Sequence, residues 1–217
     1  MSELPDFVIA LQKRLMLDLP GERARSPLSP PHRPMLDDAE IAQRNPFIAS
    51  VLVLLHPDPC DVHPALVLIE RSKGGGVHSG QIALPGGKQE AGESSLETAL
   101  REAQEEIGVN PHAVHVLGQL SRLYVPPSNF LVFPFVGWMM QKPELEPNPQ
   151  EVSRMFSLNL GAFLQQDAVV RSRVSGANGH QFDVPAFQID EHLIWGATAM
   201  MLAELLEVYS DARSEFE

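Results

Sequence analysis

Five glutamates and a single arginine fall within fourteen consecutive positions of this chain. They are Glu93, Glu97, Arg101, Glu102, Glu105 and Glu106. Two carboxylates about 6 Å apart repel by about 3 kcal/mol at an effective dielectric of about 20, whereas an exposed like-charge pair on a helix costs only about 0.2–0.5 kcal/mol. The cluster is therefore either a solvated acidic face or a site whose acids share a divalent cation. Carboxylate oxygens are hard ligands, which suit Mg²⁺ or Mn²⁺ rather than zinc.

The spacing of these residues fits a helix. At about 100° per residue, the arginine and the three glutamates that follow it form one stripe, and an apolar stripe adjoins it. The apolar residues are Leu96, Ala99, Leu100, Ala103 and Ile107. Ser94 and Glu97 make a capping box, and Gly108 stands where a helix would stop. We therefore expect a helix over residues 94–107.

The segment before this helix, Leu84-Pro85-Gly86-Gly87, predicts an apolar strand end followed by a tight turn aimed at the helix. Glycines at such a place let backbone carbonyls and amides approach a ligand closely. This flank favours the cation site over the solvated acidic face. Further upstream, Gly74-Gly75-Gly76 is not a phosphate-binding loop of the Walker kind, because no Gly-Lys-Ser/Thr follows, and we expect a mobile loop there.

The stretch from Gly87 to Val109 resembles the signature of the Nudix hydrolases, G-x5-E-x7-R-E-U-x-E-E-x-G-U, in which U is a bulky apolar residue. Every polar and glycine position of that signature matches. The matching residues are Gly87, Glu93, Arg101, Glu102, Glu105, Glu106, Gly108 and Val109. Ala103 is smaller than the usual U residue, a departure that affects packing more than chemistry. The resemblance implies hydrolysis of a nucleoside diphosphate linked to another group.

The resemblance also implies a role for each matching residue. The metal ligands would be the Gly87 carbonyl, Glu102, Glu105 and Glu106. The metal, Mg²⁺ or Mn²⁺, would neutralise the diphosphate oxygens and polarise the attacking water. Arg101 would orient a glutamate of the signature, which fits its i,i+4 spacing from Glu105, and Glu93 would join it in fixing the loop to the helix.

The identity of the general base stays open. Glu151, in the segment EVSRMF, resembles a loop glutamate that in Nudix proteins often approaches the metals. Its alternative interpretation is an exposed loop residue. Glu105 could itself serve as the base through a metal-bound water. The catalytic residues we expect are therefore Arg101, Glu105 and Glu151.

Upstream, the stretch from Val67 to Lys88 resembles the pattern LLTxRSx3Rx3Gx3FPGG of the coenzyme A diphosphatase branch. The matching residues are Leu68, Arg71, Ser72, Gly80, Pro85, Gly86 and Gly87. The departures are Val67, Ile69, Gly76 and Leu84. Gly76 matters most, because an arginine there would suit the 3′-phosphate of coenzyme A. The segment 194–199 is also similar to the end of that branch. The residues expected to bind substrate are Arg71, Ser72, Gly80 and Gln81, with His78 as an alternative contact.

Two classes of function remain open. One is an enzyme that cleaves coenzyme A or its esters into 3′,5′-ADP and phosphopantetheine, with ADP-ribose, NADH or dinucleoside polyphosphates as alternative substrates. The other is a Nudix-fold module that senses a nucleotide without cutting it. The complete set of Glu102, Glu105 and Glu106 favours the enzyme.

Composition narrows the class of protein. A chain of 217 residues that is 44% hydrophobic is expected to form one domain with a good core. Its net charge of −12 argues against nonspecific binding to nucleic acid or to an anionic membrane. The longest apolar run, near 51–55, is too short to cross a bilayer, and the N-terminus lacks the regions of a signal peptide. The single cysteine, Cys60, excludes an internal disulfide and indicates a cytoplasmic protein, in which we expect a buried, inert thiol.

Apolar periodicity outlines the remaining elements. We expect an N-terminal helix and proline-rich arm over residues 1–44, a Nudix hydrolase domain over 45–211 and a tail over 212–217. The expected helices are 5–17 and Gly196–Tyr209. The expected strands are Phe47–Leu55, Ala65–Glu70, Val114–Leu123, Phe130–Val136, Gln181–Gln188 and His192–Trp195, with turns at 126–129 and 189–191. Strands mixed with two long helices indicate an α+β protein, and with the resemblance a Nudix-type α/β/α sandwich with a mixed β-sheet.

The arm from Gly21 to Pro34 contains four prolines and three arginines, so we expect it to be irregular or extended. In one interpretation it wraps onto the core or a partner chain. In the other, Arg23, Arg25 and Arg33 reach a substrate. The apolar character of this region and the habit of the Nudix family suggest a homodimer.

Overall fold

The computed structural model describes residues 3–31, 33–72, 80–175 and 181–214. The expected loop at Gly74–Gly76, the departure at Gly76 and the contact expected of His78 lie outside these ranges.

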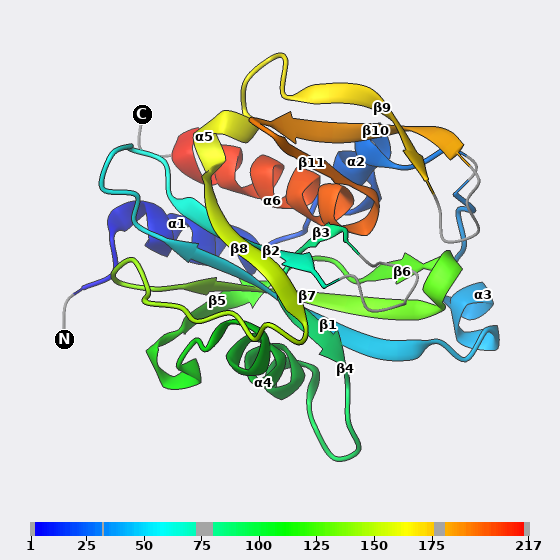
Figure 1. The fold of residues 1–217 in the computed structure, drawn as a ribbon, viewed down its shortest axis with the longest axis horizontal. Coiled ribbons are helices and arrows are strands. Elements are labelled where there is room, and N and C mark those ends of the chain that lie inside the picture. The colour runs from blue at the N-terminus through cyan, green and yellow to red at the C-terminus, as the bar shows by residue number, and fades with distance from the viewer. Residues whose placement is uncertain (1–2, 32, 73–79, 176–180, 215–217) are drawn as a thin grey trace.

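A mixed sheet runs through the middle of the molecule (Figure 1). Its strands are β1 (Phe47–His56), β2 (Ala65–Arg71), β3 (Ile82–Ala83), β4 (Gly86–Lys88), β5 (His115–Gln119), β6 (Leu123–Val125), β7 (Phe130–Trp138) and β8 (Val152–Asn159). Five strands follow the order β3-β2-β1-β7-β5, while β4, β6 and β8 pair with β1, β7 and β2. β1 runs parallel to β7, and the other pairs are antiparallel. The expected mixed sheet is therefore confirmed.

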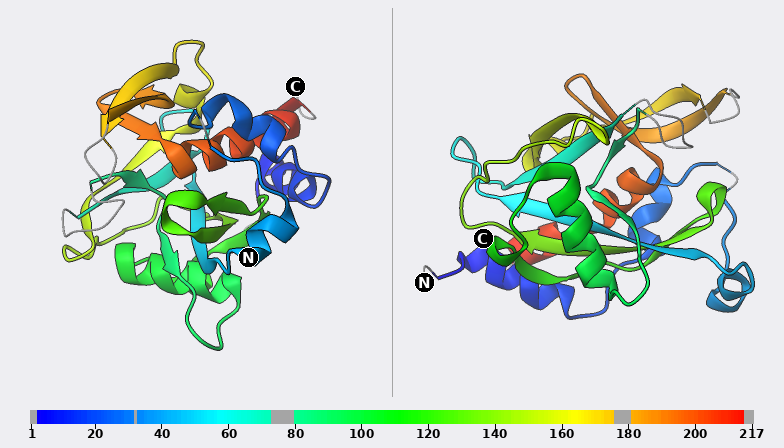
Figure 2. Two further views of the ribbon diagram at one scale, coloured as in Figure 1. Left: turned by 90° about the vertical axis from the view of Figure 1, so that its right-hand side faces the viewer. Right: turned by 60° about the horizontal axis from the view of Figure 1, so that its bottom comes forward.

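Helices cover both faces of this sheet (Figures 1 and 2). They are α4 (Ser95–Ile107) on one face and α1 (Asp6–Leu15) and α6 (Gly196–Ser214) on the other. The central strand β1 contacts both layers, because Leu52 and Leu54 pack with α4 while Val53 and Leu55 join the cluster that contains α1 and α6. A strand buried on both faces reads as a continuous apolar run, which is why the sequence predicted it. The α/β/α layering is confirmed.

A second, three-stranded antiparallel sheet lies on the α6 side of the molecule (Figure 1). Its strands are β9 (Val169–Ser175), β10 (Gln181–Ile189) and β11 (His192–Trp195). The expected hairpin is β10–β11, with Asp190 at φ +50° in its turn. A short helix, α5 (Leu160–Phe163), follows β8. The sequence did not predict β8 or β9.

The N-terminal arm packs against α6 and is partly helical, so the expectation of an irregular arm was wrong for this part. Its helical segments are α2 (Glu22–Arg25) and a 3₁₀ turn (Ser26–Leu28), while α3 (Asp38–Gln43) follows the arm. The cause is a buried ion pair between Arg25 and Glu204 of α6. Glu204 Oε1 also accepts hydrogen bonds from Gly21 N and Ser121 N, both at 3.2 Å. The arm is therefore held at its base by one buried carboxylate.

The other two arginines of the arm also meet carboxylates of this chain. Arg23 pairs with Glu207, and Arg33 Nη1 lies 2.8 Å from Glu22 Oε1. Because all three guanidinium groups have such partners, the structure supports a structural arm over one that reaches substrate.

Two further expectations differ from the structure. The single strand expected over Val114–Leu123 is divided into β5 and β6, because Leu120 N still bonds Pro134 O of β7 at 2.9 Å, but Pro134 has no N–H with which to continue the ladder. Cys60 is exposed rather than buried, since it lies in the loop after β1, where its N donates to Asp58 Oδ1 at 3.0 Å. Within the described part of the chain, no helix combines the length and apolar character needed to cross a membrane.

Replacing Glu204 by Gln should lower the free energy of unfolding by about 3–5 kcal/mol, because it leaves the Arg25 charge buried without its counterion. Urea denaturation measures this loss. Glu207→Gln is the matched control on the same helix, and it should cost less than about 1 kcal/mol, because its partner Arg23 is exposed and remains solvated when the pair is lost. Equal losses in the two variants would contradict the anchoring role of the Arg25–Glu204 pair.

Candidate active site

Helix α4 begins and ends where the sequence predicts. Ser94 Oγ accepts a hydrogen bond from Glu97 N at 3.3 Å, and Glu97 Oε2 accepts one from Ser94 N at 2.8 Å. At the other end Gly108 adopts φ +68°, a left-handed conformation that favours glycine, and its N donates to Gln104 O at 2.9 Å. Both caps fix which residues of α4 face the sheet.

The Arg101 guanidinium contacts three carboxylates of the acidic cluster. Its Nε lies 2.5 Å from Glu93 Oε1, and its Nη1 lies 2.9 Å from both Glu102 Oε1 and Glu105 Oε2. Glu93 and the other two acids raise the pKa of Arg101, so its charge is permanent. In return, hydrogen bonding from Arg101 lowers the pKa of Glu93 to about 2. Arg101 therefore holds the loop after β4 against the helix, and its positive charge offsets the negative charges of Glu102 and Glu105, two of the expected metal ligands.

Glu106 is the buried member of the cluster, with 1% of its surface exposed. Its Oε2 accepts a hydrogen bond from Gly86 N at 2.7 Å, and its Oε1 lies 3.3 Å from Arg71 Nη1. Burial raises the pKa of Glu106 to about 7, although Arg71 and the Gly86 amide oppose that shift. A cation nearby would favour the ionised form of this carboxyl group.

Two glycines bring β4 against both β1 and α4. The tight turn expected at Gly86-Gly87 is wrong, because these residues form a short strand in register with Val51 and Ser50. A Cβ at Gly86, where φ is +151°, would lie 2.3 Å from Ser50 O. A Cβ at Gly87 would lie 2.3 Å from Glu102 Oε2. Gly86 therefore requires glycine, whereas at Gly87 a Cβ would displace only the end of the Glu102 side chain; the close approach expected of these glycines occurs within a sheet rather than a turn.

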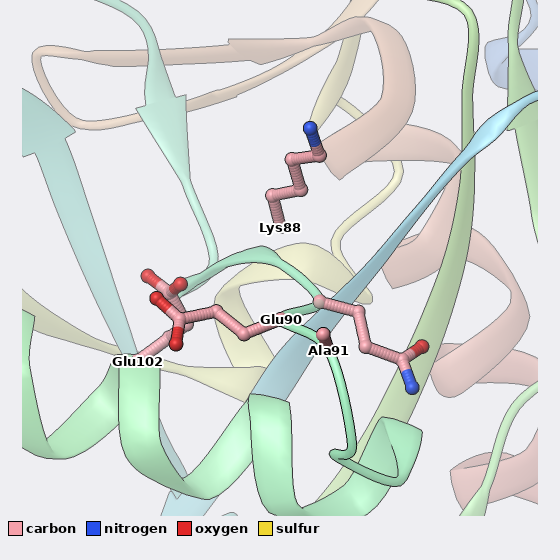
Figure 3. Close-up of a pocket in the computed structure, with 5 residues that line it drawn as sticks. Lys88, Glu90, Ala91 and Glu102 are labelled. Carbon is pink, nitrogen blue, oxygen red and sulfur yellow. The ribbon is translucent and has the colours of Figure 1, made fainter.

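A cavity of about 460 Å³ opens beside Glu102 (Figure 3). It is lined by Lys88, Gln89, Glu90, Ala91 and Glu102. Burial raises the pKa of the Glu102 carboxyl, and Arg101 opposes that shift. Lys88 and Glu90 were not singled out in the sequence, because they occupy variable positions of the signature. The only feature of the sequence that could have indicated these two residues is their position between Gly87 and Glu93 of the signature.

Glu151 lies near the acidic cluster. After the larger effect of burial, its charge adds to the rise in the pKa of both Glu102 and Glu106. Its side chain is exposed, and its Oε1 accepts a hydrogen bond from Asn148 Nδ2 at 3.3 Å. The structure thus brings this loop glutamate to the site, and its role as a base stays a prediction.

The four residues expected to bind substrate lie together beside the cluster. Arg71 N donates to Gln81 O and Gly80 N donates to Arg71 O, both at 3.1 Å, while Ser72 N donates to Glu151 O at 2.8 Å. The Arg71 guanidinium bonds the Gly86 carbonyl at 2.7 Å in addition to its contact with Glu106. The structure therefore places Arg71 in support of the acids, and contact of these four residues with substrate stays a prediction.

The donor set fits a divalent cation by its chemistry. Glu102, Glu105 and Glu106 offer hard oxygens, and the missing side chain at Gly87 leaves the Glu102 carboxylate directly against the backbone of β4. Among the described residues, no three acidic, histidine or cysteine side chains yet converge closely enough to hold a metal. The reason is visible in the contacts, because Arg101 holds Glu102 and Glu105. Binding a cation would require these two carboxylates to turn from the guanidinium.

Comparison with known proteins gives a consistent result. The model of the NUDIX domain family matches residues 46–174. The chain is 34% identical to the uncharacterised Nudix hydrolase NudL of Photorhabdus laumondii over 208 residues, which is 95% of this chain and 98% of that protein. It is 36% identical to NudL of Yersinia enterocolitica over 165 residues, which is 75% of this chain and 82% of the relative.

Solved structures show the same fold. A Nudix hydrolase from M. smegmatis, RenU, superimposes with a TM-score of 0.52 and 14% identity, covering 79% of this chain and 88% of that one. A C. elegans Ap4A hydrolase superimposes with a TM-score of 0.50 and 15% identity, covering 77% of this chain and 99% of that one. At these identities the likeness concerns the fold alone.

Alanine substitution should reduce the stability of the protein by different amounts at the two glycines of β4. Gly86→Ala should lower the free energy of unfolding by about 3 kcal/mol or more, because its Cβ meets the β1 backbone at a φ that L-residues avoid. Gly87→Ala should cost less than about 1 kcal/mol, since only the mobile end of Glu102 must move. Urea denaturation measures both, and a crystal structure of Gly87→Ala should show the Glu102 carboxylate displaced. Similar instability in both variants would contradict this description of β4.

Proposed function

This chain belongs to the Nudix family of hydrolases, and we propose that its substrate is coenzyme A or a coenzyme A ester. The reaction would be hydrolysis of the diphosphate bond. Water adds across the P–O–P linkage, which leaves 3′,5′-ADP and the phosphopantetheine half as the two phosphate products. Members of this family act on small nucleotide substrates and generally use divalent metals.

The observation that carries this proposal is the contact between the two sequence patterns. Arg71 belongs to the upstream pattern that resembles the coenzyme A diphosphatase branch, and it bonds Glu106 and the Gly86 carbonyl of the acidic site. Ser72 of the same pattern bonds the backbone of Glu151. The residues that suggest the substrate therefore adjoin the residues that suggest the chemistry.

Glu102, Glu105, Glu106 and the Gly87 carbonyl would hold Mg²⁺ or Mn²⁺ in this proposal. When bound, the cation supplies neutralisation of the diphosphate oxygens and acidifies water. The chain itself supplies the positioning. Arg101 restrains the loop through Glu93, Arg71 holds Glu106 against β4, and Glu151 or Glu105 takes the proton from the attacking water.

One observation favours the second candidate, a module that binds a nucleotide without cutting it. Glu102 and Glu105 both contact Arg101, so the carboxylates are compensated without a metal. In a sensor that arrangement would persist with the nucleotide bound. In the enzyme, Glu102 and Glu105 would leave Arg101 and bind the cation instead.

Turnover with Mg²⁺ or Mn²⁺ on a panel of diphosphate compounds tests the proposal. Coenzyme A should be cleaved faster than ADP-ribose, NADH or a dinucleoside polyphosphate, with 3′,5′-ADP as a product identified by chromatography. Glu105→Gln should lower kcat by about 100-fold or more, because losing one ligand of a catalytic cation removes at least about 3 kcal/mol of transition-state stabilisation.

Glu144→Gln is the control for that experiment, since it removes one exposed acid outside the site. It should leave turnover unchanged. Much faster cleavage of ADP-ribose would contradict the substrate, and tight nucleotide binding without products would contradict catalysis and support the sensor.

A further inference from the structure

The two arginines at the site are already engaged by acids. Arg101 contacts Glu93, Glu102 and Glu105, and Arg71 contacts Glu106. Lys88 differs, because no carboxylate of the described residues forms an ion pair with it, and its side chain is exposed. The chain carries a net charge of −12, and its cavity includes Glu90 and Glu102, so a substrate phosphate enters an unfavourable field. Lys88 is the basic residue among those that line this cavity, so its charge opposes that field.

The Lys88 ammonium is held at a defined place. Its Nζ lies 4.2 Å from the centroid of the Phe47 ring, a cation–π arrangement. Phe47 is 51% exposed at the start of β1, and its ring packs against Phe130 with the centroids 5.7 Å apart. The backbone is fixed as well, because the Lys88 carbonyl accepts a hydrogen bond from Arg101 Nη2 at 3.3 Å. An ammonium over a ring still has donors to offer an oxyanion.

The direction of Lys88 separates it from the acidic cluster. On β4, Gly87 is in register with Ser50 and faces Glu102, while Lys88 is in register with Ala49. Successive residues of a strand point to opposite faces, so Lys88 points to the face on which Ala49 joins the α1 and α6 core cluster. Figure 3 shows Lys88 pointing away from Glu102 although both line one cavity. A substrate with its diphosphate at Glu102 would meet Lys88 with another of its groups.

We propose that Lys88 is a specificity residue that binds a phosphate monoester on the nucleotide half of the substrate, outside the diphosphate, and that Phe47 is its positioning residue. This inference rests on the proposed function, because it takes the diphosphate to lie at the acidic cluster. Coenzyme A carries such a monoester at its 3′ position. The lysine would then fill a role that the upstream pattern assigns to an arginine at position 76.

Calorimetry with two nucleotides that differ by one phosphate tests the proposal, because it needs no turnover. The wild-type protein with Mg²⁺ should bind 3′,5′-ADP about 10- to 100-fold more tightly than 5′-AMP, the range expected for a charged hydrogen-bonded contact. Lys88→Met should remove that ratio by weakening 3′,5′-ADP alone, and Lys88→Arg should keep most of it. Phe47→Leu should reduce the ratio, and Phe47→Trp, which retains the cation–π partner, should restore it.

Thermal unfolding of each variant checks that it folds, which is expected for exposed and half-exposed positions. The proposal is overturned if wild type does not distinguish the two nucleotides, if Lys88→Met keeps the ratio, or if Lys88→Met weakens the binding of both nucleotides equally.

Turnover separates this inference from the proposed function. If the protein shows the lysine-dependent binding ratio but does not cleave coenzyme A, the proposed function is wrong and the phosphate subsite is supported. If the protein cleaves coenzyme A and dephospho-coenzyme A, and Lys88→Met leaves the ratio of the two rates unchanged, the phosphate subsite is wrong and the proposed function is supported.

Discussion

The compensation of crowded carboxylates by Arg101 is the interaction on which the site depends. From its place on α4, the Arg101 guanidinium contacts Glu102 and Glu105 of the same helix and Glu93 of the preceding loop. It thereby joins the loop after β4 to the helix. The acids of the cluster differ in the direction of their pKa shifts. The pKa of Glu93 falls to about 2 under the influence of Arg101, whereas burial raises the pKa of Glu102 and takes that of Glu106 to about 7. The cluster therefore combines one carboxylate whose ionised form Arg101 stabilises with two whose ionised form burial disfavours.

The rest of the fold places this helix against the correct strand. β1 packs against α4 through Leu52 and Leu54, and it pairs with β4 beside them. The two glycines of β4 allow that strand to touch β1 on one side and Glu102 on the other. On the opposite layer, the buried Arg25–Glu204 pair ties the N-terminal arm to α6. One short strand thus connects the hydrophobic framework to the acidic cluster.

Features set by neighbouring residues along the chain could be predicted from the sequence, and features set by distant contacts could not. The capping box at Ser94 and the apolar run of β1 are local signals, and both were predicted correctly. Gly86 and Gly87 form a strand only because β1 lies beside them, which no local pattern reveals. The same reason explains why Lys88 was missed, since its place over Phe47 depends on the β1–β4 register.

The central claim is that the glutamate face of α4 holds a divalent cation once a nucleotide is present. Electron paramagnetic resonance of Mn²⁺, with 3′,5′-ADP added, measures this directly, because bound Mn²⁺ loses the sharp signal of the free ion. The account predicts that the wild-type protein and Glu144→Gln deplete the free signal, and that the double substitution Glu102→Gln, Glu105→Gln abolishes the depletion. A free signal left unchanged by the wild-type protein, or depleted equally by the double variant, would contradict it.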